Sequence, residues 1–138
     1  MSDLLYYSDS VITKYKPAQV FIYEGDNDVA AGKKTEAIIK DADALIKRIT
    51  DKVPGVQIVI ISVKPSVLRW TLKDEYLKLN DGYKILSSTY KNVRFIDVWH
   101  PLLNNQGTPE KKIFISDSLH INNLGYDIWA REIKKVIK

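Results

Sequence analysis

Hydrophobic residues follow two different periods along this chain. Three short runs are apolar at nearly every position: residues 18–23 (AQVFIY), 56–63 (VQIVIISV) and 93–98 (VRFIDV). Runs of this length that are rich in β-branched and aromatic side chains are typical of strands buried on both faces, as in a parallel sheet. The pattern therefore predicts three buried strands.

The segments between these strands have apolar residues every three or four positions, which predicts amphipathic helices. From Thr35 onward the apolar stripe is clear, and Pro54-Gly55 ends it. Three further helices are expected. The first begins at Ser2 and Asp3, as N-cap residues, and stops before Pro17. The second has an apolar stripe over 72–90, in which Gly82 marks close packing and Tyr76, Tyr83 and Tyr90 belong to the core.

The last helix runs from Asn122 or Asn123 to Ile137. Its inward positions are Leu124, Ile128, Trp129, Ile133 and Val136.

Helices and strands alternate along the chain, with one long loop over 100–120 before the last helix. This order predicts an α/β fold in which a parallel sheet carries helices on both faces. Neither internal repeats nor low-complexity segments interrupt the pattern. We expect a single domain over residues 1–138.

Composition narrows the possible functions. The chain has 138 residues, and 21 Lys and Arg against 17 Asp and Glu give a net charge of +4. Because the lysines are scattered, they indicate a solvated surface rather than a nucleic-acid site. The absence of cysteine excludes thiolate zinc sites and a cysteine nucleophile. With only two histidines we expect neither a metal site nor a cofactor, and no apolar run is long enough for a membrane span.

Candidate chemistry gathers at the ends of the predicted strands, where open α/β sheets carry their sites. Gly25-Asp26-Asn27-Asp28 follows the first strand, and the Asn27 amide can donate to a developing oxyanion. A plain turn, with Asp28 as a cap or brace, is the alternative. Asp117 and His120 lie three residues apart, so that the carboxylate can orient the imidazole as a general base. Alternatively, Asp117 caps the last helix and His120 is a surface residue.

Together these two motifs resemble the SGNH (GDSL-type) esterase and lipase family, as does Lys64-Pro65-Ser66 followed by Arg69-Trp70. The resemblance implies a three-layer, flavodoxin-like SGNH hydrolase fold and a Ser-His-Asp mechanism on a small ester substrate. The site residues that it implies are His120 and Asp117 as catalytic base and acid, Asn27 as the oxyanion donor, and Gly25, Lys64 and Trp70 in the oxyanion and substrate-binding site.

Two parts of the family pattern have no counterpart in the sequence: the Gly-Asp-Ser block with the nucleophile and the block with an oxyanion glycine. Ser8-Asp9-Ser10 falls inside a predicted helix, and neither Ser66 nor Ser116 has the family context. We therefore expect an N-terminally truncated domain that has little or no esterase activity by itself. The alternative is a non-catalytic α/β binding or assembly module derived from that fold.

The missing blocks also bear on assembly. In the family the nucleophile strand lies beside the strand that corresponds to residues 18–23, so this strand is expected at an open edge. An open apolar edge strand is a template for pairing with another chain. We expect a homodimer through this edge, an exchanged N-terminal segment, or an N-terminal fragment that covers it. The compartment is left open.

Overall fold

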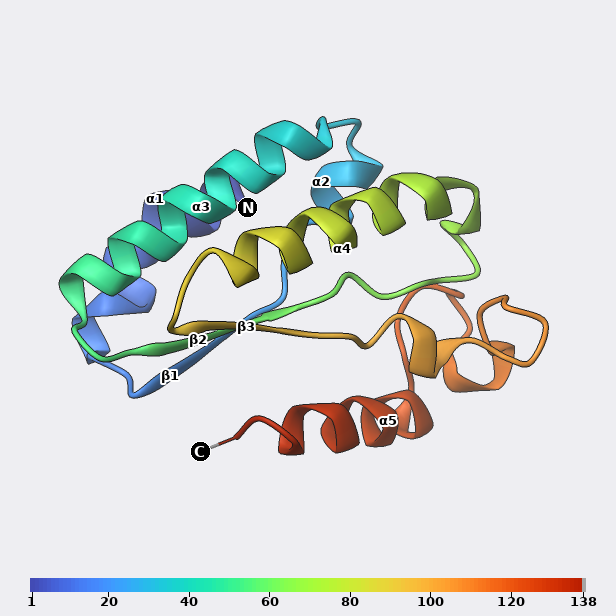
Figure 1. Ribbon diagram of the computed structural model, residues 1–138. Helices are drawn as coiled ribbons and strands as arrows, with labels where there is room; N and C mark the ends of the chain where they lie inside the picture. The colour runs from blue at the N-terminus through green and yellow to red at the C-terminus, as the bar shows by residue number, and fades with distance from the viewer. Residues whose placement is uncertain (138) are drawn as a thin grey trace.

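The computed structural model describes residues 1–137 and contains one parallel sheet. Its strands are β1 (Gln19–Ile22), β2 (Gln57–Ile61) and β3 (Val93–Ile96), in the order β1-β2-β3. Val20 pairs with Ile58 in the first ladder, and Ile60 pairs with Phe95 in the second. Helices cover both faces of the sheet, as Figure 1 shows. The predicted α/β architecture is confirmed.

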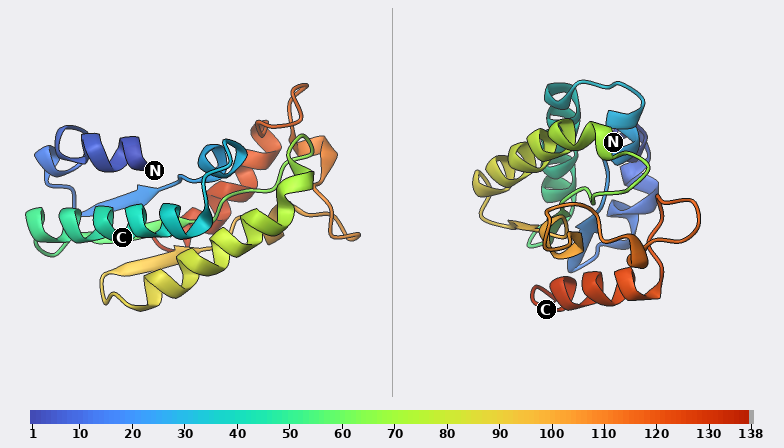
Figure 2. Two further views of the ribbon diagram at one scale, coloured as in Figure 1. Left: turned by 90° about the horizontal axis from the view of Figure 1, so that it is seen from above. Right: turned by 90° about the vertical axis from the view of Figure 1, so that its right-hand side faces the viewer.

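The helices are divided unequally between the two faces. α1 (Ser2–Val11), α3 (Thr35–Lys52) and α4 (Lys73–Ser88) lie on one face, and α5 (Asn123–Lys134) lies alone on the other (Figures 1 and 2). A short helix, α2 (Asp26–Ala30), is the next element after β1. The face around α5 is therefore covered by less protein than the face around α3 and α4.

Side chains of the central strand alternate between two apolar clusters because successive residues of a strand point to opposite faces. Ile58 and Ile60 belong to the cluster with α3 and α4. Val59 and Ile61 pack on the other side, together with Trp129 of α5. Every one of these four strand residues is at least 96% buried. This explains why the strand has no polar face in the sequence.

The packing of α4 against α3 confirms two expectations. A Cβ on Gly82 would lie 2.9 Å from the Ile39 Cδ1 atom, so this glycine allows the two helices to approach closely. Tyr76 and Tyr83 are each 1% exposed and belong to the core. Tyr90 is partly buried against the same cluster.

Several predicted details were wrong. Met1, rather than Ser2 or Asp3, caps α1, and that helix ends at Val11 before a 3₁₀ turn over Thr13–Tyr15. Leu124 is 53% exposed although the stripe placed it inside. The first turn of α5 lies beyond the carboxyl ends of the strands, so the sheet cannot cover it (Figure 1). None of the helices in residues 1–137 is long and apolar enough to cross a membrane.

Candidate active site

The turn that carries Asn27 begins at a glycine for which no other residue fits. Gly25 has φ +113° and serves as the N-cap of α2 without a side-chain cap. A Cβ at this position would lie 2.8 Å from both Leu79 Cδ2 and the Tyr83 hydroxyl. The chain thus leaves β1 by a sharp turn, and Asn27 follows in the first turn of α2. The sequence predicted a turn here but not this helix.

Two core tyrosines hold this turn through their hydroxyl groups. The Tyr83 hydroxyl donates to the Glu24 carbonyl at 3.0 Å, and the Tyr76 hydroxyl donates to the Asp26 carbonyl at 3.1 Å. Burial raises the pKa of both phenols, so they remain neutral donors. Sequence reasoning placed both tyrosines in the core but missed this function. The available signal was the choice of tyrosine over phenylalanine on a buried stripe.

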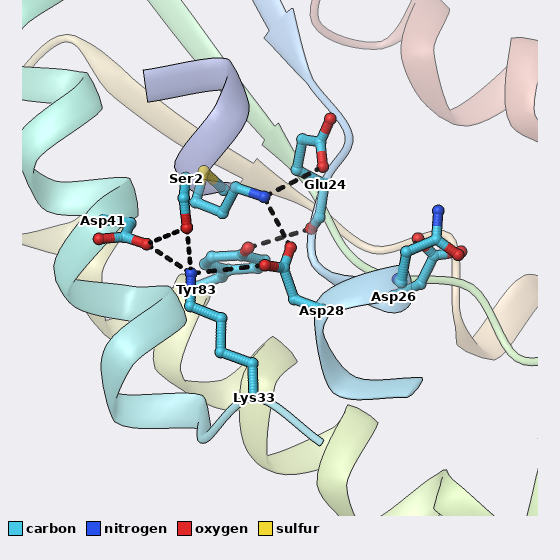
Figure 3. A network of polar contacts seen from close by, with 9 residues as sticks. Ser2, Glu24, Asp26, Asp28, Lys33, Asp41 and Tyr83 are labelled. Carbon is cyan, nitrogen blue, oxygen red and sulfur yellow. Dashed lines mark hydrogen bonds and ion pairs between the residues drawn. The ribbon is translucent and has the colours of Figure 1, made fainter. Parts of the chain in front are cut away.

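An ion-pair network braces the other side of the same turn (Figure 3). The Met1 α-ammonium donates to Asp28 Oδ2 at 2.6 Å and lies 3.4 Å from Glu24 Oε2. Lys33 reaches Asp28 Oδ1 at 3.4 Å and Asp41 Oδ2 at 2.6 Å, and it lowers the pKa of Asp41. Asp28 is therefore held away from the chemistry, in the bracing position expected for it.

Asp117 and His120 form the hydrogen-bonded pair that their spacing predicts. Asp117 Oδ2 lies 2.6 Å from His120 Nδ1, while Oδ1 accepts from the backbone N–H groups of Leu119 and His120, each at 2.9 Å. These bonds lower the Asp117 pKa to about 2, and the bond to the imidazole contributes most. The carboxylate thus fixes one ring nitrogen. No residue of the described chain 1–137 bonds to the other, Nε2.

The loop of this pair is attached to the segment that follows β2. Lys64 is only 7% exposed, and its Nζ donates to the Leu119 carbonyl at 2.7 Å. The Leu68 N–H donates to the carbonyl of Ser118 at 3.0 Å. Ser118 has φ +60°, a backbone conformation that a serine adopts only when its surroundings hold it. Desolvation lowers the Lys64 pKa, and its ammonium braces the loop of the base.

Asn27, Lys64 and His120 line one pocket of about 260 Å³ at the carboxyl edge of the sheet. The expected convergence of the Asn27 turn and the His120 loop is therefore present. Gly25 and Trp70 do not line this pocket. Gly25 instead allows the sharp turn that precedes Asn27, and Trp70 stacks on Trp99 with ring centroids 5.9 Å apart. The pocket is completed by Tyr23, Glu24, Asp26, Leu119, Ile121, Tyr126 and Trp129.

No serine, threonine or cysteine lines this pocket within the described residues. Ser66 is 2% exposed, and its Oγ accepts from the Arg69 N–H at 3.2 Å, so it is neither free nor accessible. Ser8 is fully buried and bonds within α1 to Leu5. In residues 1–137, no three His, Asp or Glu side chains gather closely enough to hold a metal ion.

A second pair repeats the geometry of Asp117 and His120 at the end of β3. Asp97 Oδ2 lies 2.6 Å from His100 Nδ1, and Asp97 Oδ1 accepts from the N–H groups of Trp99 and His100. This pair lines a different pocket of about 250 Å³, beside α4. These backbone bonds anchor the start of the loop that follows β3. The sequence contained the signal, since both pairs have the spacing Asp-x-x-His.

Several solved structures, some of them esterases, have a fold similar to that of this chain. A protein of Streptococcus pneumoniae, provisionally named a platelet activating factor, superposes with a TM-score of 0.86 at 22% identity. The match covers 96% of this chain and 65% of that one. A family 3 carbohydrate esterase from Talaromyces cellulolyticus gives a TM-score of 0.80 at 16% identity, with 97% of this chain and 64% of the esterase covered.

A GDSL-like lipase from Bacteroides thetaiotaomicron gives a TM-score of 0.74 at 20% identity. The match covers 95% of this chain and 67% of the lipase chain. At such identities the likeness is one of fold. The chain spans about 65% of the length of the first of these structures. No curated protein sequence matches it.

The family itself is shown by sequence. The profile of the GDSL-like lipase/acylhydrolase family matches residues 4–128, a stretch that includes the Asn27 turn, the segment after β2 and the Asp117–His120 loop. The fold and the position of the pocket at the carboxyl edge are consistent with this match. The chain belongs to the GDSL-like lipase/acylhydrolase family.

Proposed function

We propose that residues 1–138 supply the general base and an oxyanion donor for the hydrolysis of small carboxylic esters, and that the nucleophilic hydroxyl comes from outside these residues. The observation that carries this proposal is that Asn27 and His120 line one pocket while Asp117 occupies Nδ1 of His120. His120 Nε2 then accepts the hydroxyl proton as the oxygen attacks the ester carbonyl. Asn27 Nδ2 donates to the oxyanion, and His120 returns the proton to the leaving alcohol. Water releases the acyl group by the same steps.

By itself the chain should be a poor esterase. The hydroxyl of Tyr23, which lines the pocket, donates to Asp26 at 3.1 Å, and burial and the Asp26 charge raise its pKa well above the ordinary value. Such a phenol is a weak nucleophile at neutral pH because almost none of it is ionised. Water is then the attacking group, and we expect hydrolysis barely above background.

An added alcohol tests the base and the pocket without the missing hydroxyl. Trifluoroethanol and p-nitrophenyl acetate are supplied together, and formation of trifluoroethyl acetate is followed over time. The wild-type chain should accelerate this transfer, and His120→Ala should abolish the acceleration because the alcohol keeps its proton. His100→Ala is the matched control, since it removes an imidazole of the same geometry from the other pocket. Equal rates for wild type and His120→Ala would refute the proposal.

The free edge of β1 is where we propose that the strand carrying this hydroxyl docks. In the described part of the chain β1 pairs only with β2. Along its open side lies a groove of about 400 Å³ with Leu4, Val11, Ile12 and Phe21 in its wall. This groove shares Tyr23 and Glu24 with the pocket of His120. A strand parallel to β1 would therefore end, at its carboxyl end, beside the base.

Sedimentation at micromolar concentration tests this docking surface. We propose that the chain does not persist as a compact monomer, since an open apolar edge pairs readily. An assembly of two copies through β1 is one expected result, and complex formation with a strand-bearing N-terminal fragment is the other. Phe21→Lys should weaken either assembly by placing a charge on the open edge. A monomer whose β1 amides are protected from hydrogen exchange would contradict this part of the proposal.

A non-catalytic assembly module is the second candidate function, and the absence of serine, threonine and cysteine from the described residues of the pocket favours it. The two candidates differ in the trifluoroethanol experiment. A module without catalytic function gives no acceleration with any variant while still assembling through β1.

A further inference from the structure

The side chain of Asn27 is held by one cation. Arg69 Nη1 donates to Asn27 Oδ1 at 2.9 Å, across 42 residues of sequence. A guanidinium has only donors, so it can bond to the oxygen of the amide and not to its nitrogen. The NH₂ group is then the end left free to donate, and within residues 1–137 it has no hydrogen-bond partner.

Arg69 is itself fixed in place. Its side chain is 20% exposed, and Nη1 lies 3.8 Å from Asp26 Oδ2, whose carboxylate is 16% exposed. The Arg69 N–H donates to Ser66 Oγ at 3.2 Å, which fixes the backbone from which the guanidinium extends. The Tyr76 hydroxyl holds the Asp26 carbonyl. The cation is thus set between the segment after β2 and the Asn27 turn.

The same segment after β2 also holds the other half of the site. Lys64 bonds to the Leu119 carbonyl at 2.7 Å, and the Leu68 N–H bonds to the Ser118 carbonyl at 3.0 Å. Residues 64–69 therefore contact the loop of the base through Lys64 and Leu68, and the donor amide through Arg69. The relative position of Asn27 and His120 is set through this segment.

We propose that Arg69 is a positioning residue that orients the Asn27 amide with its NH₂ group toward the pocket of His120. The role of that amide as an oxyanion donor rests on the proposed function, whereas its orientation does not. An amide without this bond turns between its two planar orientations, and in one of them an oxygen faces the oxyanion. A permanently charged donor with no acceptor atom excludes that orientation.

The expected loss of rate in Arg69→Met has a lower and an upper limit. If the two amide orientations become equally populated, only half of the molecules present a donor, so the loss is about twofold. Removal of the donor itself, as in Asn27→Ala, sets the upper limit, because loss of one oxyanion donor typically lowers kcat by a factor of about 10²–10³. Arg69→Met keeps the length of the stem and should fall between these limits, on kcat rather than on KM.

NMR spectroscopy tests the orientation without turnover. The ¹³Cγ shift of Asn27 reports hydrogen bonding to Oδ1, and Asn27→Ala assigns the signal. In Arg69→Met this shift should move toward that of a solvated asparagine, and Arg69→Lys should restore part of it because lysine can donate one bond. Lys73→Met is the matched control: it removes a nearby positive charge, 5.7 Å from the Trp70 ring centre, that does not contact Asn27.

An unchanged Asn27 ¹³Cγ shift in Arg69→Met, or an equal change in Lys73→Met, would overturn the proposal. If Arg69→Met does not fold, substitution of the exposed residue Asn27 tests the contact instead. Asn27→Ala should release the guanidinium, whose Nη–H signals should then average by rapid rotation, and sharp, separate signals would refute the contact. A correct shift pattern with no alcohol transfer would leave the positioning intact and reject the proposed function. Alcohol transfer by the wild-type chain together with an unchanged Asn27 ¹³Cγ shift in Arg69→Met would support the proposed function and reject the positioning role of Arg69.

Discussion

Substitution of Gly25 by alanine should destabilise this protein far more than the same change at another left-handed glycine. Gly25 has φ +113°, and a Cβ there would lie 2.8 Å from Leu79 Cδ2 and 2.8 Å from the Tyr83 hydroxyl. The left-handed backbone costs an alanine about 1–2 kcal/mol. Forcing the buried neighbours aside costs about 1–3 kcal/mol more. The expected loss is thus about 2–5 kcal/mol of unfolding free energy.

Gly32→Ala separates these two contributions. Gly32 has φ +81°, and nothing lies within 4 Å of its Cβ position, so only the backbone cost applies. Urea unfolding should therefore give a difference of about 1–3 kcal/mol between Gly25→Ala and Gly32→Ala. A difference below about 0.5 kcal/mol would refute the argument, because even the effects of independent substitutions are additive only to within about that amount.

A double-mutant cycle identifies the clashing atom. Tyr83→Phe removes the hydroxyl that the new methyl group would meet, together with its bond to the Glu24 carbonyl. Gly25→Ala should then cost less in the Tyr83→Phe background than in wild type, with a coupling of about 0.5 kcal/mol or more. Absence of coupling would assign the whole clash to Leu79.

Two further predictions concern α5 and the Asp117–His120 loop. Asn122 caps α5 by accepting from the Leu124 N–H at 2.9 Å, so Asn122→Ala should lower the unfolding free energy by about 1 kcal/mol, whereas Asn123→Ala should have little effect in the same urea titration. The pKa of Asp117 is lowered from 3.8 to about 2, so its contribution to stability is present above about pH 4 and is lost as the pH falls toward 2. The difference in urea midpoint between wild type and Asp117→Asn should shrink over that range, and a difference that stays constant down to pH 2 would contradict the assignment.

The sequence by itself determined the elements and the local chemistry. Periods of hydrophobicity located the three strands and the four long helices, because a strand buried on both faces can carry almost no polar side chains. The bond between Asp117 and His120 was also predictable, since three residues within one turn bring the two groups together. Leu124 was misplaced by the same reasoning, because periodicity does not reveal where the sheet ends.

Only the tertiary structure decided which local features form the site. Asp97 and His100 have the same spacing and the same bond as Asp117 and His120, yet only His120 shares a pocket with Asn27. The bonds that place Asn27 and its turn join residues 42 to 59 positions apart, from Arg69, Tyr76 and Tyr83. Such bonds depend on the order and register of the strands and on how closely α4 approaches the turn. Sequence periodicity specifies which face of an element is buried, whereas the partner atom across the sheet edge exists only after the elements have packed.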